Sequence, residues 1–307
     1  MDYILKIDNV SKCYEGQVAV DTVSLQIPQG SIFGLLGPNG AGKTSLIRMI
    51  TTITRPDTGH IELLGQALNS EHPKKIGYLP EERGLYKKMK VGEHLLYLAR
   101  LKGLSKNEAT TEARQWLERL ELGDRWDQPV EALSKGLQQQ VQFIATVIHR
   151  PPLLILDEPF SGLDPVNTNR LKDEIRALHA AGTSIIFSTH RMEQVEEICE
   201  YIALINRGQK VLDGRVSEVR ESYKQHHFKL EYRGELSPSI REQFKLLHQA
   251  EGQLTFAAAP DKSTNDLLRI LLDMGVQIRA FSEILPSLND IFIRTVSKQS
   301  TAQTTST

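Results

Sequence analysis

Residues 31–53, SIFGLLGPNGAGKTSLIRMITTI, contain the strongest structural signal in the chain. An apolar run at 32–36 is broken by the glycine-rich segment 37–42, after which apolar residues recur at helical spacing. The three parts predict a short buried strand, a loop and an amphipathic helix, in that order. The loop matches the pattern G-x-x-x-x-G-K-[ST] in the strand–loop–helix context that the pattern requires.

The residue types of this loop suit a phosphate group. Glycine permits positive φ and leaves room for backbone N–H groups to surround an anion, and the helix that follows directs its positive end to the same point. We expect Lys43 to reach the β- and γ-phosphates of a nucleotide and the Thr44 hydroxyl to bind Mg²⁺. A glycine-rich turn that serves only packing is the alternative. The predicted nucleotide-binding residues of the loop are Gly37, Pro38, Asn39, Gly40, Ala41, Gly42, Lys43, Thr44 and Ser45.

The composition is that of an ordinary globular protein. A chain of 307 residues suggests one large domain or two, and the net charge of −1 gives no sign of nucleic-acid binding. Cys13 and Cys199 fit no metal or disulfide spacing, so we expect reduced thiols in a cytosolic setting. No apolar run approaches the ~20 residues of a membrane helix, and no secretory signal is visible. A role at a membrane would require another chain to cross it.

The pattern along the first two thirds of the chain predicts an α/β fold. Alternating stretches at 3–30 predict antiparallel strands, and helical periodicity predicts a helical subdomain inserted at about residues 85–150. Strand-like runs then alternate with helical segments; the runs are 153–159, 184–190 and 202–206. This alternation predicts a mainly parallel sheet flanked by helices, in a first domain that covers residues 1–222.

The chain changes character near residue 223. FKLEYRG, GQLTFAAAP and QIRAFSEIL predict strands, whereas SPSIREQFKLL, STNDLLRILLDMG and SLNDIFIRTV predict helices. We therefore expect a small α+β domain at 223–297. The polar segment 298–307 lacks apolar residues and predicts a disordered tail.

Two acids and a histidine follow predicted strands, at the edge where α/β sheets bind ligands. Asp157 occupies the usual position of an acid that holds Mg²⁺, and Glu158 is the candidate to polarise an attacking water. His190 is placed to contact a γ-phosphate and to orient Glu158. The alternatives are a strand end that emerges into solvent and a structural histidine. Tyr14 ends an early strand, where it either stacks on an adenine or simply packs.

Six motifs in one order resemble the ATP-binding subunits of ATP-binding-cassette (ABC) transporters. They are Tyr14, GPNGAGKT (37–44), LSKGL (133–137), LILDEP (154–159), SGLD (161–164) and STH (188–190). The resemblance covers roughly residues 3–220 and implies a P-loop NTPase cassette that uses ATP and Mg²⁺. It also implies that Tyr14 stacks on adenine, that Glu158 is the catalytic base and that His190 assists it. The segment after 223 resembles the C-terminal extension of drug, antibiotic or sodium exporters.

The resemblance further implies a dimer. Two cassettes would close head-to-tail over two ATP molecules, so that Ser134 and Gly136 of one chain cap the γ-phosphate held by the other, with Asp164 at the seam. A helix that begins at Ser134 is consistent with this role, because helix N-termini bind anions. The implied partners are a second ATP-binding subunit, most simply an identical chain, and an integral membrane permease. The implied location is the cytoplasmic face of the membrane.

Four positions depart from the family pattern. Lys135 replaces a glycine, Leu137 a glutamine and Gln140 an arginine that would have supplied a cationic contact. Glu81 replaces the glutamine that senses Mg²⁺ in the family, and its carboxylate can still meet the metal.

The sequence thus predicts an ATPase that drives a separate permease, and the resemblance implies that the transporter is an exporter. The alternative is a soluble cassette ATPase that acts on ribosomes or DNA. Such proteins usually carry two cassettes, a long coiled coil or a basic linker, none of which is visible in this sequence. A third interpretation, a nucleotide sensor that does not hydrolyse, would require Glu158 or His190 to be missing.

Overall fold

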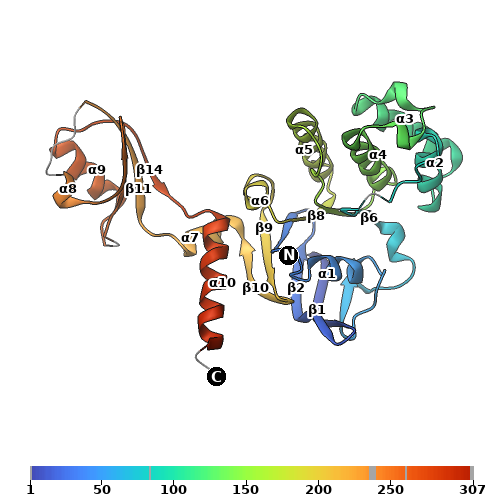
Figure 1. Cartoon of the computed structure of the whole chain (residues 1–307), viewed down its shortest axis with the longest axis horizontal. Helices are drawn as coiled ribbons and strands as arrows, with labels where there is room; N and C mark the ends of the chain where they lie inside the picture. Colours follow the sequence, from blue (N-terminus) through green and yellow to red (C-terminus); the bar gives the residue numbers. More distant parts are fainter. Residues whose placement is uncertain (1, 83, 235–239, 260, 305–307) are drawn as a thin grey trace. The chain divides into compact units, whose positions relative to one another are not determined.

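The computed structural model describes residues 2–82, 84–234, 240–259 and 261–304, and the chain divides into two compact units (Figure 1). The units are Met1–Val216 and Ser217–Thr307. The division falls before the boundary expected after residue 222, at the start of helix α7 (Val216–Ser222). Arg220 of α7 donates from Nε to the carbonyl oxygen of Pro286 at 3.0 Å, and this contact ties the helix to the second unit.

A six-stranded sheet forms the centre of the first unit, in the order β10-β9-β3-β8-β7-β6. Its strands are β3 (Ile32–Leu36), β6 (Ile76–Leu79), β7 (Leu153–Asp157), β8 (Ser184–Thr189), β9 (Tyr201–Asn206) and β10 (Gln209–Arg215). Every neighbouring pair is parallel except β9 and β10. Strands β3, β7 and β8 are buried along their whole length, as continuous apolar runs in a covered parallel sheet should be. The predicted α/β fold with a mainly parallel core is confirmed.

An antiparallel sheet precedes and follows the phosphate loop in sequence. It has the order β2-β1-β4-β5 and consists of β1 (Tyr3–Tyr14), β2 (Gln17–Pro28), β4 (Thr58–Leu63) and β5 (Gln66–Ala67). Helix α1 (Lys43–Ile50) packs in one apolar core with this sheet and with the central sheet. Ile47 of α1, Val23 of β2 and Ile155 of β7 are members of that core. The core fixes α1 directly behind the end of β3.

Helices make up the remainder of the first unit. The helical subdomain contains α2 (Val91–Leu101), α3 (Lys106–Arg119) and α4 (Lys135–Val147), with 3-10 turns at Gly123–Arg125 and Val130–Ala132; a further 3-10 turn, His72–Lys75, leads directly into β6. Trp116 of α3 meets Phe143 of α4 edge to face, with ring centroids 6.0 Å apart. Helices α5 (Pro165–Ala180) and α6 (Met192–Ile198) follow β7 and β8. Of the helices in the described ranges, none combines the length and apolar composition that crossing a membrane requires.

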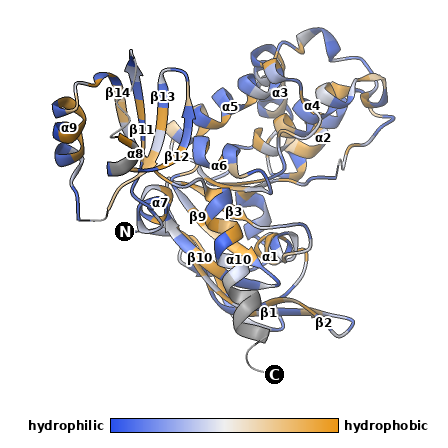
Figure 2. Cartoon of the chain, turned by 60° about the vertical axis from the view of Figure 1, so that its left-hand side comes forward, coloured by the Kyte–Doolittle hydropathy of each residue, from blue (hydrophilic) through white to orange (hydrophobic). Residues whose placement is uncertain are grey.

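The second unit is built on an antiparallel sheet of order β12-β13-β11-β14. Besides α7 its elements are β11 (His227–Arg233), α8 (Ile240–Gln243), β12 (Lys245–Ala250), β13 (Gln253–Ala257), α9 (Thr264–Asp273), β14 (Gln277–Ile284) and α10 (Leu288–Thr304). Phe228, Phe256 and Phe281 stack in its core. Figure 2 shows hydrophobic and hydrophilic residues mixed along α9, whose buried Leu267 and Leu271 belong to the same core.

Two expectations for this unit differ from the structure. Residues 245–247, expected at the end of a helix, belong to β12, because pairing with β13 satisfies their backbone groups in the sheet. The segment 298–307, expected to be disordered, is helical as far as Thr304. No glycine or proline interrupts the sequence from 288 to 304, so the polar residues extend the helix that the apolar ones begin. Residues 305–307 lie outside the described ranges.

Candidate nucleotide-binding site

Two glycines allow the loop between β3 and α1 to take its shape. Gly37 has φ 150° and a Cβ built there would lie 2.1 Å from the carbonyl oxygen of Ile205. Gly42 has φ 107° and its Cβ would lie 2.3 Å from the carbonyl oxygen of Ala19. Any side chain at either position would therefore collide with backbone, as well as being strained by the positive φ. The loop passes this closely under neighbouring strands, and within it the N–H of Ala41 donates to the carbonyl oxygen of Pro38 at 3.1 Å.

A cavity of about 230 Å³ lies against this loop. The predicted loop residues 39–45 line it, and so do three predicted acidic residues from the central sheet and its loops. The lining residues are Ala19, Asn39, Gly40, Ala41, Gly42, Lys43, Thr44, Ser45, Glu81, Asp157 and Glu158. The fold therefore brings a phosphate-binding loop and three carboxylates from distant segments to one cavity.

Lys43 places a nearly buried ammonium group in the cavity. Its side chain donates to the carbonyl oxygens of Gly37 at 2.7 Å and Pro38 at 3.0 Å, so the amine is held over the loop. Burial lowers the pKa of Lys43, and the negative charges of Asp157, Glu158 and Glu81 oppose that effect. The amine is therefore positioned to exchange its backbone partners for phosphate oxygens.

Asp157 ends β7 with its carboxylate buried. Its Oδ1 accepts from Ser188 Oγ of β8 at 2.7 Å. Burial raises the pKa of Asp157, as do the carboxylates of Glu81 and Glu158, whereas Ser188 and Lys43 lower it. The site thus holds more negative charge than its own residues compensate, which is the electrostatic setting of a cation site.

The donors around Asp157 suit Mg²⁺. Carboxylate and hydroxyl oxygens are the ligands that this hard cation prefers, and Asp157, Glu81 and Thr44 supply them in the one cavity. Within the described ranges, no group of three or more histidine, cysteine, aspartate or glutamate side chains forms a complete metal site. This donor set fits an ion that takes its remaining ligands from water and from nucleotide phosphates.

Glu158 is held in one orientation by the end of β8. The residue adopts φ 50°, which is uncommon for a residue other than glycine, and its N–H donates to the carbonyl oxygen of Ser188 at 2.9 Å. Its carboxylate accepts from His190 N at 2.8 Å and from Thr189 Oγ1 at 3.1 Å, and lies 2.6 Å from His190 Nδ1. The Glu158 side chain is 12% exposed and that of His190 is 49% exposed. The arrangement fixes a carboxylate beside the cavity and leaves the imidazole accessible to a ligand.

The cavity lining does not include the predicted site residues Gly37, Pro38, His190, Tyr14, Ser134 and Gly136. Tyr14 ends β1 and is 37% exposed, with Lys12 Nζ 5.5 Å from the centroid of its ring. Ser134 caps α4 by accepting from Leu137 N at 3.3 Å. A Cβ built on Gly136 would make ordinary contacts of 3.6 Å with the carbonyl oxygen of Gly162 and the side chain of Leu163. Ser134 is exposed and Gly136 is half-buried.

Sequence reasoning missed Gln139 and Gln142 of α4 and noted Gln140 only as a departure from the family pattern. Gln139 donates from Nε2 to the carbonyl oxygen of Pro159 at 3.1 Å, directly after the catalytic candidate in sequence. Gln140, where the family has arginine, is buried and donates to Asn167 Oδ1 at 2.6 Å, so it serves a contact within the chain. Asn167 N in turn donates to Asp164, the cap of α5, at 2.9 Å. The sequence does contain a signal for these contacts, which is the run of glutamines on the buried side of an otherwise amphipathic helix.

Comparison with known proteins adds the following relationships. Residues 20–161 match the family described as ABC transporter, and residues 214–296 match the C-terminal domain of DrrA1-3-like ATP-binding proteins. The ABC transporter ATP-binding protein YhaQ of Bacillus subtilis is 44% identical over 302 residues, 95% of this chain and 98% of that protein. The daunorubicin/doxorubicin resistance ATP-binding protein DrrA of Streptomyces peucetius is 29% identical over 94% of this chain and 91% of that protein. A solved ATP-binding subunit of an ABC transporter matches 72% of this chain and 93% of its own, with TM-score 0.68 and 30% identity.

The uncompensated charge at Asp157 leads to a stability prediction. Asp157→Asn should raise the midpoint of thermal unfolding of the nucleotide-free protein at pH 7 by about 2–4 °C, because an ionised buried carboxylate is removed. Burial raises the pKa of Asp157 in the folded protein, which means that its ionised form destabilises the fold and its protonated form does not. The gain in unfolding midpoint from Asp157→Asn should therefore vanish as the pH falls below 3.8, the ordinary pKa of an aspartate. Scanning calorimetry of both proteins across pH measures this, with the exposed Asp213→Asn as control. A lower midpoint for Asp157→Asn at pH 7 would contradict the electrostatic description.

Proposed function

Because this chain belongs to the ATP-binding subunits of ABC transporters, we propose that it hydrolyses ATP with Mg²⁺ and thereby drives export through a separate membrane permease. One observation carries the hydrolytic part of this proposal. Lys43 and the carboxylates of Asp157 and Glu158 converge on the cavity of the phosphate loop, and Glu158 is oriented by two residues of the β8 end. This is the group of functions that phosphoryl transfer to water requires: phosphate binding, metal binding and activation of water.

Each residue has a distinct role in the proposal. The loop N–H groups and Lys43 bind the β- and γ-phosphates, and Tyr14 stacks on the adenine. Thr44, Asp157 and Glu81 hold Mg²⁺, which neutralises charge that develops on the phosphates. Glu158 accepts a proton from the attacking water. His190 holds the Glu158 carboxylate through Nδ1, and its exposed ring is free to contact the γ-phosphate.

We further propose that a second copy completes the site. Ser134 is exposed, Gly136 is half-buried, and neither lines the cavity of its own chain. The first N–H groups of α4 have no partner within the helix, so its N-terminus attracts an anion. In a head-to-tail dimer this N-terminus would meet the γ-phosphate bound by the other copy, and Asp164 would lie at the seam.

The exporter assignment rests on relatives. The name of DrrA of Streptomyces peucetius states resistance to daunorubicin and doxorubicin, and that protein matches this chain over both units. The match at 214–296 to DrrA1-3-like C-terminal domains supports the same subfamily. The proposed setting is the cytoplasmic face of the cell membrane, where the permease holds the chain as a peripheral subunit.

The soluble alternative, a cassette ATPase that acts on ribosomes or DNA, has less support. The net charge of −1 offers no excess of positive charge to bind nucleic acid, and the chain carries one phosphate loop. A nucleotide sensor without hydrolysis is also disfavoured, because Glu158 and His190 are both present and hydrogen-bonded to one another.

The role of Glu158 can be tested by an isosteric change. Glu158→Gln should lower the rate of ATP hydrolysis by about 10²–10⁴-fold, because the amide cannot accept the proton of water. ATP should stay bound, and size-exclusion chromatography with Mg-ATP should show a larger fraction of dimer than for the unmodified protein. Glu193→Gln, at an exposed position in the first turn of α6, is the matched control and should hydrolyse ATP normally. Hydrolysis at the unmodified rate in Glu158→Gln would remove this residue from the catalytic role.

The partner class can be tested by isolating complexes. The tagged chain, purified from membranes dissolved in mild detergent, should carry with it a membrane protein that has several spanning helices. Mass spectrometry of the purified material identifies the partner. Ribosomal proteins in place of a membrane protein, at comparable yield from the soluble fraction, would favour the alternative function and contradict the transport role.

A further inference from the structure

Strand β6 lies at the edge of the central sheet and is held on one side by side chains from the helical subdomain. Polar side chains of that subdomain donate to four backbone carbonyl oxygens, one on every second residue from Ile76 to Glu82. Lys102 Nζ donates to the Ile76 carbonyl at 2.9 Å, and Thr146 Oγ1 lies 3.4 Å from that of Tyr78. The side-chain amide of Gln142 donates to the last two carbonyls, those of Pro80 and Glu82. An edge strand that continues into a loop is thus fixed by a row of polar side chains rather than by another strand.

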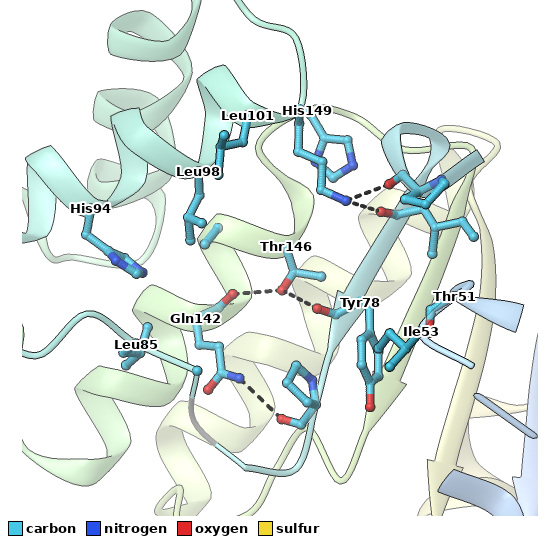
Figure 3. Close-up of a pocket in the computed structure, with 16 residues that line it drawn as sticks. Thr51, Ile53, Tyr78, Leu85, His94, Leu98, Leu101, Gln142, Thr146 and His149 are labelled. Carbon is cyan, nitrogen blue, oxygen red and sulfur yellow. Dashed lines mark hydrogen bonds between the residues drawn. The ribbon is translucent and has the colours of Figure 1, made fainter. Parts of the chain in front are cut away.

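Gln142 is the member of this row that binds the backbone on either side of Glu81, a residue that lines the nucleotide cavity. Its Nε2 is 3.2 Å from the carbonyl oxygen of Pro80 and 3.4 Å from that of Glu82. Figure 3 shows the amide extending from α4 to the chain that leaves β6, one turn along the helix from Thr146. The side chain is 5% exposed, so water does not compete freely for these bonds.

Glu81 lies between the two carbonyls that Gln142 binds. Its carboxylate lines the cavity of the phosphate loop and acts on the pKa of Asp157 and of Lys43, which places its charge near both. Glu81 itself is exposed, and within the described part of the chain no other side chain holds its carboxylate. The backbone on either side of Glu81 therefore sets the point from which this side chain enters the cavity, and Gln142 holds that backbone.

We propose that Gln142 is a positioning residue for Mg²⁺-nucleotide binding, acting through the backbone of residues 80–82 to place the Glu81 carboxylate at the metal site. The inference rests on the proposed function, because it requires Glu81 to meet Mg²⁺. A merely structural Gln142 would stabilise the contact between α4 and β6 without affecting the metal. The two roles differ in what they predict for the Mg²⁺ dependence of nucleotide binding.

The test uses the full chain and a non-hydrolysable ATP analogue. Isothermal titration gives the Kd of the analogue in EDTA and over a series of Mg²⁺ concentrations. Gln142→Met preserves the length of the side chain but removes the amide, and should raise the half-saturating Mg²⁺ concentration about tenfold, as loss of an outer-shell contact does. The Kd in EDTA should change by less than about twofold, because the phosphate loop is untouched.

Two comparisons separate positioning from structure. Thr146→Val removes the neighbouring polar contact on the same helix and should leave the Mg²⁺ dependence unchanged. In a Glu81→Ala background, adding Gln142→Met should cause no further shift, because the group it positions is absent. Gln142→Asn retains the amide but shortens its reach, and serves as a second variant with the same expected shift if Gln142→Met does not fold.

The outcomes are distinct. An unchanged Mg²⁺ dependence in folded Gln142→Met, or an equal additional shift in the Glu81→Ala background, would overturn the inference. If Thr146→Val shifted the Mg²⁺ dependence as much as Gln142→Met does, the effect would be structural, and the inference would also fail. An unmodified protein whose nucleotide affinity ignores Mg²⁺ would contradict the proposed function itself, before any variant is made.

Discussion

An imbalance of charge dominates this site. One ammonium group, that of Lys43, faces the carboxylates of Glu81, Asp157 and Glu158, which leaves a formal charge of −2 (one positive against three negative) before any nucleotide enters. A triphosphate adds more negative charge to the same cavity. Such an assembly becomes stable only when positive charge and N–H donors are added, and the chain supplies the N-terminus of α1 for part of that need. Mg²⁺ and the N-terminus of α4 from another copy would supply the rest.

The fold brings these groups to one edge of the central sheet. The buried runs of β3, β7 and β8 end respectively at the phosphate loop, at Asp157 and just before His190. Their parallel alignment puts all three ends on the same side, as expected for ligand sites in open α/β sheets. Helix α4 connects to this edge from the helical subdomain, through Gln139 at Pro159 and Gln142 at Pro80.

The sequence alone was sufficient for features that depend on local pattern. The phosphate loop and the acids after 153–156 follow from short motifs whose residue types are dictated by chemistry, and the parallel sheet follows from alternating apolar runs. Features that depend on contacts between distant segments were not predictable. Gln142 reaches a carbonyl 62 positions away, and Gln139 reaches one 20 positions away. The periodicity of one segment does not reveal which distant segment it will contact.

The central claim is that each chain holds half of a hydrolytic site, and mixing two defective chains tests it most directly. Lys43→Ala removes phosphate binding, and Ser134→Arg blocks the N-terminus of α4, so neither variant alone should hydrolyse ATP. In a mixed dimer both defects fall on one of the two sites and the other is intact, so an equimolar mixture should regain about a quarter of the unmodified activity. A mixture as inactive as its components, although mixed dimers form, would contradict the account.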